Sequence, residues 1–161
     1  MNAAINLIKA SENLGQYLQK NNAHIVTAES CTGGWLAQCI TDIAGSSAWF
    51  DRGFITYSNQ AKIDMLGVKS ETLAQFGAVS AEVAMQMTAG ALQHSAADYA
   101  IAITGIAGPT GGSLEKPIGS VYIAWQKKHH PAKVTLAHFN GNREQVRKQA
   151  VYQALNIIPD E

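Results

Sequence analysis

Strand patterns and helical patterns alternate along this chain, and this alternation constrains its fold more than any other feature. Apolar residues recur at helical spacing from Ile5 to Leu18, ahead of the first strand. Strands are expected at 24–28, 48–57, 99–104, 119–126 and 134–139. Later helices are expected at 35–43, 59–66, 71–76, 81–94 and 143 to about 156. Strands that alternate with helices form a sheet covered on both faces, and the last two strands form a hairpin. The fold class predicted is α/β, a single three-layer α/β/α domain with a mixed sheet.

Composition narrows the function classes. The 161 residues hold no linker or repeat, so one domain is expected over 1–161. Twelve basic and twelve acidic residues leave no net charge, whereas a non-specific nucleic-acid binder needs a positive excess. No stretch approaches the roughly 18 apolar residues of a membrane span. The expected partner is therefore a small-molecule substrate, with no nucleic acid and no membrane. A homo-oligomer is a reasonable expectation because exposed hairpin strands often pair.

Cysteine and histidine usage bears on compartment and metals. Cys31 and Cys39 form no CxxC or zinc pattern, so they are interpreted as reduced thiols of a cytoplasmic protein. The segment after Met1 lacks the basic and apolar regions of a secretory signal. The five histidines show no paired-ligand spacing, so no metal and no cofactor are expected.

The first motif with chemical potential is Thr27–Gly34, TAESCTGG, which carries a strand into a helix. Such a turn presents Ser30 at a helix start, where free backbone N–H groups can hold an oxyanion or a phosphate. A capping serine with glycines for close packing is the plain alternative. Cys31 is a rival nucleophile, although cysteines are more often buried hydrophobes.

Two basic segments follow. Tyr57 ends a strand, Ser58 or Asn59 caps the next helix, and Lys62 lies near its first turn. The positive end of the helix dipole lowers the pKa of an amine there, which suits a general base; a solvated surface lysine is the alternative. Arg143 and Arg147 lie at the start of the last helix, where they can bind a phosphate or carboxylate or pair with nearby acids.

The densest glycine cluster is Thr104–Gly112, TGIAGPTGG. It follows a buried strand, lacks the lysine of a P-loop, and does not open a helix as a dinucleotide fingerprint does. Successive glycines let backbone N–H groups converge on an anion. A ligand-wrapping loop explains this cluster better than a plain flexible one.

Together these motifs resemble the CinA C-terminal-domain family, whose active members are nicotinamide-nucleotide amidases. The resemblance rests on TAESCTGG, on Tyr57-Ser58-Asn59 with Lys62, and on TGIAGPTGG with Lys116-Pro117-Ile118-Gly119, and it covers nearly the whole chain. The domain is often fused behind another in that family; here it is expected to stand alone.

The resemblance implies hydrolysis of nicotinamide mononucleotide to nicotinic acid mononucleotide and ammonia. It implies Ser30 as nucleophile, Lys62 as its base and Tyr57 as the hydroxyl that relays or orients the proton. The oxyanion would be held by N–H groups near Ser30–Gly33 or at Thr104-Gly105. The residues expected to bind substrate are Cys31, Thr32, Gly33, Gly34, Asn59, Thr104, Gly105, Ala107, Gly108, Gly112 and Arg143.

Two other hypotheses remain. A catalytically inactive nucleotide-binding or partner-binding module could use the same fold, but it would not need a nucleophile beside a lysine. A thiol amidase could use Cys31, but no histidine in the sequence is placed to deprotonate it.

Overall fold

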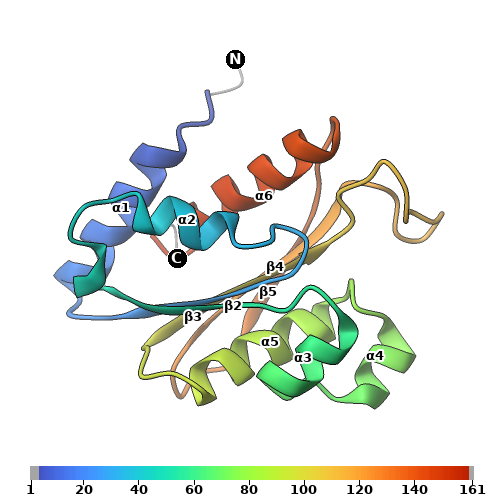
Figure 1. Ribbon diagram of the computed structural model, residues 1–161, viewed down its shortest axis with the longest axis horizontal. Helices are drawn as coiled ribbons and strands as arrows, with labels where there is room; N and C mark the ends of the chain where they lie inside the picture. Colours follow the sequence, from blue (N-terminus) through green and yellow to red (C-terminus); the bar gives the residue numbers. More distant parts are fainter. Residues whose placement is uncertain (1–3, 160–161) are drawn as a thin grey trace.

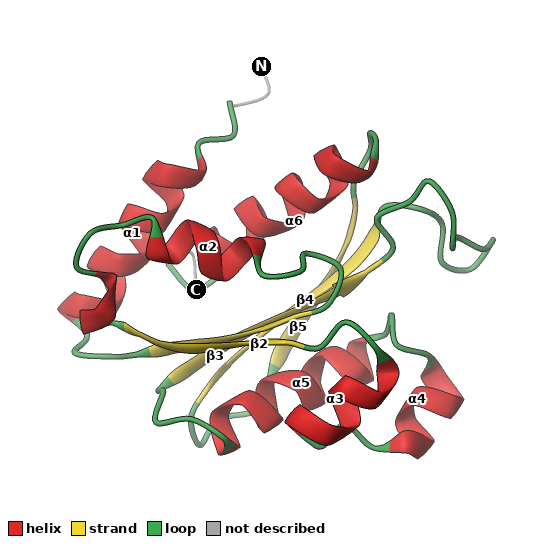
Figure 2. Cartoon of the chain, viewed as in Figure 1, coloured by secondary structure: helices red, strands yellow, loops and turns green. Residues whose placement is uncertain are grey.

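The computed structural model describes residues 4–159, in which five strands form one mixed sheet between two layers of helices (Figures 1 and 2). The strand order is β2-β1-β3-β4-β5. The strands are β1 (Ile25–Glu29), β2 (Phe50–Ile55), β3 (Tyr99–Gly105), β4 (Ser120–Lys127) and β5 (Lys133–His138). β1 pairs in parallel with β2 and β3, whereas β4 is antiparallel to β3 and β5. The predicted α/β/α fold with a mixed sheet is confirmed. Residues 1–3 and 160–161 of the expected domain lie outside the described residues.

The helices divide between the two faces of the sheet (Figure 1). One face carries α1 (Leu7–Lys20), α2 (Trp35–Thr41) and α6 (Arg143–Asn156), and the other carries α3 (Asn59–Leu66), α4 (Ser70–Phe76) and α5 (Ala81–Gln93). Along residues 4–159, no helix combines the length and the apolar character needed to cross a bilayer. The layer with α3 and the layer with α6 therefore lie on opposite faces of the sheet.

Side-chain caps fix where three of these helices begin. The hydroxyls of Ser58 and Ser80 accept from the third residue of α3 and of α5, which satisfies one N–H group at each helix start. Asn142 and Gln145 form a reciprocal capping box at the start of α6. Ser80 and Asn142 are the predicted caps, and Ser58 rather than Asn59 takes this place at α3.

The second strand is shorter than predicted. Residues Ser46–Ala48 form a 3-10 turn, η1, and Trp49 leaves extended geometry and turns its side chain into the core at 1% exposure. The strand therefore begins at Phe50, and it ends at Ile55. Helix α2 also ends before Ile43, at Thr41.

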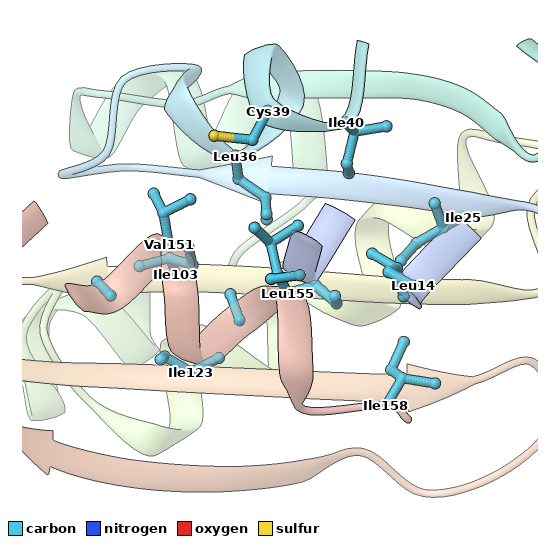
Figure 3. Close-up of a cluster of buried hydrophobic side chains, with 14 of the residues drawn as sticks. Leu14, Ile25, Leu36, Cys39, Ile40, Ile103, Ile123, Val151, Leu155 and Ile158 are labelled. Atoms are coloured by element: carbon cyan, nitrogen blue, oxygen red, sulfur yellow. The ribbon is translucent and has the colours of Figure 1, made fainter. Parts of the chain in front are cut away.

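Two hydrophobic cores flank the sheet, and they differ in the size of the strand side chains that they receive. The core under α1, α2 and α6 receives large side chains from alternate strand positions, among them Ile25, Ile103 and Ile123 (Figure 3). The opposite face carries small residues such as Ala28, Ala100, Ala102 and Ala124, which let α5 pack closely. Gly90 of α5 is so close to the Leu66 carbonyl that no Cβ would fit there.

The carboxyl ends of the three parallel strands meet at one edge of the sheet. β1 runs into Ser30, β2 leads to Tyr57, and β3 ends at Gly105, where the loop to β4 begins and projects from the body (Figure 1). Ligands of open α/β sheets bind at this kind of edge. Both glycine clusters found in the sequence lie here.

Candidate active site

Ser30 and Lys62 lie side by side although 32 residues separate them in the sequence. Lys62 Nζ donates to Ser30 Oγ at 2.9 Å and to the carbonyl oxygen of Thr56 at 2.8 Å. Ser30 follows β1 directly, and strand alternation turns it toward the face that α3 covers. The site thus pairs a hydroxyl from the β1 turn with an amine from α3.

Burial sets the proton affinity of the lysine. The Lys62 side chain is 1% exposed. Loss of solvent disfavours the ammonium form, so burial lowers the pKa of Lys62, and the nearby Cys31 opposes this shift. The sequence argument invoked the helix dipole; the cause that the structure shows first is burial. An amine with a lowered pKa 2.9 Å from a hydroxyl can act as its general base.

Glu29 anchors the turn that carries the serine. Its carboxylate is 1% exposed and accepts from the Thr32 hydroxyl at 2.7 Å and from the N–H groups of Leu36 and Ala37 at 2.9 and 3.1 Å. It therefore occupies N–H groups at the start of α2 that the sequence argument had left free for an anion. Sequence reasoning quoted Glu29 in the motif but gave it no role. The alternation of side chains along the strand could have indicated its position. Glu29 lies on the same strand face as Ile25, which packs in the core beneath α2.

Cys31 does not have the environment of a reactive thiol. Burial raises the pKa of Cys31 to about 11, although the Arg147 charge acts in the opposite direction. At neutral pH such a group is almost entirely protonated, and the thiolate is the nucleophilic form. Both cysteines are free and buried.

A cleft of about 250 Å³ opens over Ser30 at the carboxyl edge of the sheet. Tyr57 and Arg143 lie on its wall, and Arg143 donates to the Tyr57 hydroxyl at 3.0 Å and to the Gly108 carbonyl at 2.8 Å. Tyr57 is 62% exposed, so its hydroxyl faces the cleft mouth beside Arg143 rather than the buried amine. The lining residues are Ser30, Cys31, Tyr57, Gly105, Ile106, Ala107, Gly108, Thr110, Gly111 and Arg143.

Other residues expected at the site lie elsewhere. Thr32, Gly33 and Gly34 line a neighbouring hollow with Arg147, on the far side of the Ser30 turn. The buried Thr104 hydroxyl donates to the Ala78 carbonyl at 2.8 Å, away from the cleft. Gly112 is packed against Ile118, and Asn59 is the exposed first residue of α3. Sequence reasoning did not single out Ile106, Thr110 and Gly111, which lie between residues that it did.

Arg147 is engaged with the turn that carries Ser30. Its Nε donates to the Cys31 carbonyl and its Nη2 to the Thr32 carbonyl, both at 3.0 Å. Its guanidinium also lies over the Trp35 ring, 5.3 Å from the centroid. Arg147 therefore braces the serine turn from α6. Within residues 4–159, no three His, Cys, Asp or Glu side chains are grouped as metal ligands.

Comparisons with known proteins agree on one family. The family model described as "CinA C-terminal domain" matches residues 7–161. Nicotinamide-nucleotide amidohydrolase PncC of Escherichia coli K12 is 54% identical over 152 residues, covering 94% of this chain and 92% of that protein. The protein of the same name from Pseudomonas putida is 48% identical, covering 89% of each chain.

Solved structures share the same architecture. The competence/damage inducible protein CihA from Agrobacterium tumefaciens superposes with a TM-score of 0.92 at 43% identity, covering 99% of this chain and 98% of that one. A CinA superfamily protein from Escherichia coli superposes with a TM-score of 0.93 at 35% identity, covering 99% of this chain and 93% of that one. The six α-helices and five-stranded sheet of residues 4–159 are thus those of known structures.

Proposed function

This chain belongs to the CinA C-terminal domain family, and from that premise we propose that it hydrolyses nicotinamide mononucleotide to nicotinic acid mononucleotide and ammonia. The observation that carries the proposal is the 2.9 Å contact between Lys62 Nζ and Ser30 Oγ at the floor of the cleft. Relatives that are 54% and 48% identical are named nicotinamide-nucleotide amidohydrolases, which supports the substrate class. Both cysteines are free thiols, which supports a place for this reaction in the reducing cytoplasm.

The reaction begins with proton transfer from Ser30 to neutral Lys62. As Oγ bonds to the carboxamide carbon, the Lys62 lone pair takes the hydroxyl proton. The Thr56 carbonyl accepts one amine N–H, which keeps the lone pair directed at Ser30. Collapse of the tetrahedral intermediate breaks the C–N bond, and Lys62 returns the proton to the leaving nitrogen, which departs as ammonia. Water then hydrolyses the Ser30 ester with Lys62 again as base, which restores both residues.

The oxyanion needs donors beside Ser30, and neighbouring N–H groups are already engaged. Ser30 N–H donates to the Ile103 carbonyl, Gly33 N–H to the Ser30 carbonyl, and Trp35 N–H to the Thr32 carbonyl. The N–H group of Cys31 interacts with its own thiol, whereas that of Thr32 donates to no protein group among residues 4–159. The Thr32 N–H is therefore the proposed oxyanion donor of the turn.

The nucleotide end of the substrate is assigned to the cleft wall. Arg143 is exposed, and its hydrogen bonds to the Gly108 carbonyl and the Tyr57 hydroxyl hold its guanidinium at the cleft wall. There it can form an ion pair with the 5′-phosphate of the substrate. The loop from Gly105 to Gly111 supplies backbone around the ribose. In this assignment Tyr57 orients substrate with Arg143 and does not relay the serine proton.

The test follows ammonia release and product formation from nicotinamide mononucleotide by the purified chain, Lys62→Met and Arg143→Ala. We expect turnover by the parent and a loss of at least about a thousandfold in Lys62→Met, because the base is removed. Arg143→Ala should raise KM for the mononucleotide far more than for the phosphate-free riboside. No ammonia from the parent would leave the inactive binding module as the better account. Equal effects of Arg143→Ala on both substrates would remove the phosphate assignment.

A further inference from the structure

Both the N–H groups and the planar face of the Arg147 guanidinium contact the turn that carries Ser30 and the helix that follows it. Two of its N–H groups are donated to consecutive carbonyls, those of Cys31 and Thr32, and its face lies over Trp35. It lines the hollow beyond the turn rather than the catalytic cleft. A planar fork that meets two carbonyls at once is a geometry that arginine provides and lysine does not.

The carbonyl that Arg147 holds determines where the next N–H points. A trans peptide is planar, so its C=O and N–H point in opposite directions. The Cys31 carbonyl points toward Arg147, so the N–H of Thr32, in the same peptide, points away from it. Ser30 and Cys31 line the cleft on that other side of the turn. The contact with Arg147 thus directs an N–H group that no protein acceptor occupies.

We propose that Arg147 is a positioning residue that orients the Cys31–Thr32 peptide so that the Thr32 N–H binds the oxyanion formed on attack by Ser30. The inference rests on the proposed function. Arg147 acts through the backbone, and it touches neither reacting side chain. Removal of Arg147 therefore weakens stabilisation of the transition state and leaves ground-state binding nearly unchanged.

The proposal separates Arg147 from the proton-transfer pair. Lys62 reaches Ser30 from α3, on the face of the sheet opposite α6 (Figure 1). Burial is the largest cause of the lowered Lys62 pKa and Cys31 is the second, and Arg147 is not among the causes. Loss of Arg147 should therefore leave the pH at which the rate rises unchanged.

The experiment compares the parent with Arg147→Met, Arg147→Lys and the control Lys148→Met, an exposed neighbour on α6. The readouts are kcat, KM and the pH profile of ammonia release from nicotinamide mononucleotide. Removal of one oxyanion donor costs about 100- to 1000-fold in kcat, so Arg147→Met should lose about 100-fold. Arg147→Lys, which keeps one of two carbonyl contacts, should lose about tenfold. KM should change less than about threefold in both, and Lys148→Met should match the parent.

Three results would overturn the inference. They are an unchanged kcat, a rise in KM with kcat unchanged, and a shifted pH profile, which would mean that Arg147 acts through Lys62. If Arg147→Met does not fold, Arg147→Lys decides: a kcat equal to that of the parent overturns the inference, and the tenfold loss at constant KM supports it. A parent chain that releases no ammonia removes the proposed function and this inference with it, whereas an active parent with unaffected variants removes the inference alone.

Discussion

Replacement of Glu29 by glutamine should lower the melting temperature although the two side chains have nearly the same shape. The buried Glu29 carboxylate holds the Thr32 hydroxyl and the Leu36 N–H on one oxygen and the Ala37 N–H on the other. An amide keeps one acceptor oxygen and replaces the second with a donor. The donor would face the Ala37 N–H, so at least one of the three hydrogen bonds is lost.

The magnitude follows from the charge on the acceptor. A hydrogen bond to a charged group contributes about 1.5–3 kcal/mol, so the loss of one is expected to cost about 2 kcal/mol. For a domain of this size, 1 kcal/mol corresponds to roughly 2–4 °C, which gives a decrease of about 4–8 °C.

The assay is thermal unfolding followed by circular dichroism, with Glu71→Gln as the matched control. Glu71 is also an acid in the first turn of a helix, but it is exposed. Its interaction with the helix dipole is worth about 0.3–1 kcal/mol, so its loss should shift the melting temperature by less than about 4 °C. A decrease for Glu29→Gln no larger than that for Glu71→Gln would refute the anchoring role.

Three further predictions concern the lysine, the α3–α5 contact and the thiol. The rate of ammonia release should rise with pH as Lys62 loses its proton, with a midpoint below the usual lysine pKa because burial lowers it; a flat rate between about pH 6 and 9 would contradict this. Gly90→Ala should lower the free energy of unfolding in urea by about 1–3 kcal/mol and reduce kcat, because the new methyl group displaces Leu66 and with it the helix that carries Lys62; an effect of Gly90→Ala no larger than that of the exposed control Ala89→Ser would contradict this. At pH 8, iodoacetamide should modify Cys31 about a hundredfold more slowly than free cysteine, because its pKa is raised to about 11; a matching rate, read by mass spectrometry of the peptide, would refute the buried thiol.

Local patterns predicted the elements well because their causes are local. Ser80 and Asn142 cap helices through bonds to residues three positions away, so the sequence around them suffices. The strands and the terminal hairpin likewise follow from alternation and a polar turn. The strand order was not predicted, because pairing depends on contacts between segments far apart in the chain.

The site was predictable in its members more than in their roles. The resemblance implied Lys62 as the base of Ser30, whereas the residues alone placed Lys62 only near a helix start, because no spacing in the sequence relates the two elements that the contact joins. Arg147 was expected to bind a phosphate or carboxylate or to pair with nearby acids, and instead it donates to two backbone carbonyls of the serine turn. The alternation of side chains along β3 could have corrected the expectation that Thr104 binds substrate. Thr104 lies on the same strand face as Ala100 and Ala102 and so turns toward Ala78.

Ammonia release from nicotinamide mononucleotide by Ser30→Ala and Cys31→Ala, measured side by side with the parent at one pH, tests the central claim most directly. Ser30 and Cys31 are adjacent and both line the cleft. Within residues 4–159, Ser30 and not Cys31 has a side-chain hydrogen bond with Lys62 Nζ. Ser30→Ala should lose at least about a thousandfold in rate, because it removes the proposed nucleophile, while Cys31→Ala keeps most of the activity. Retained turnover in Ser30→Ala, or its loss in Cys31→Ala alone, would contradict the assignment of Ser30 and Lys62 as the catalytic pair.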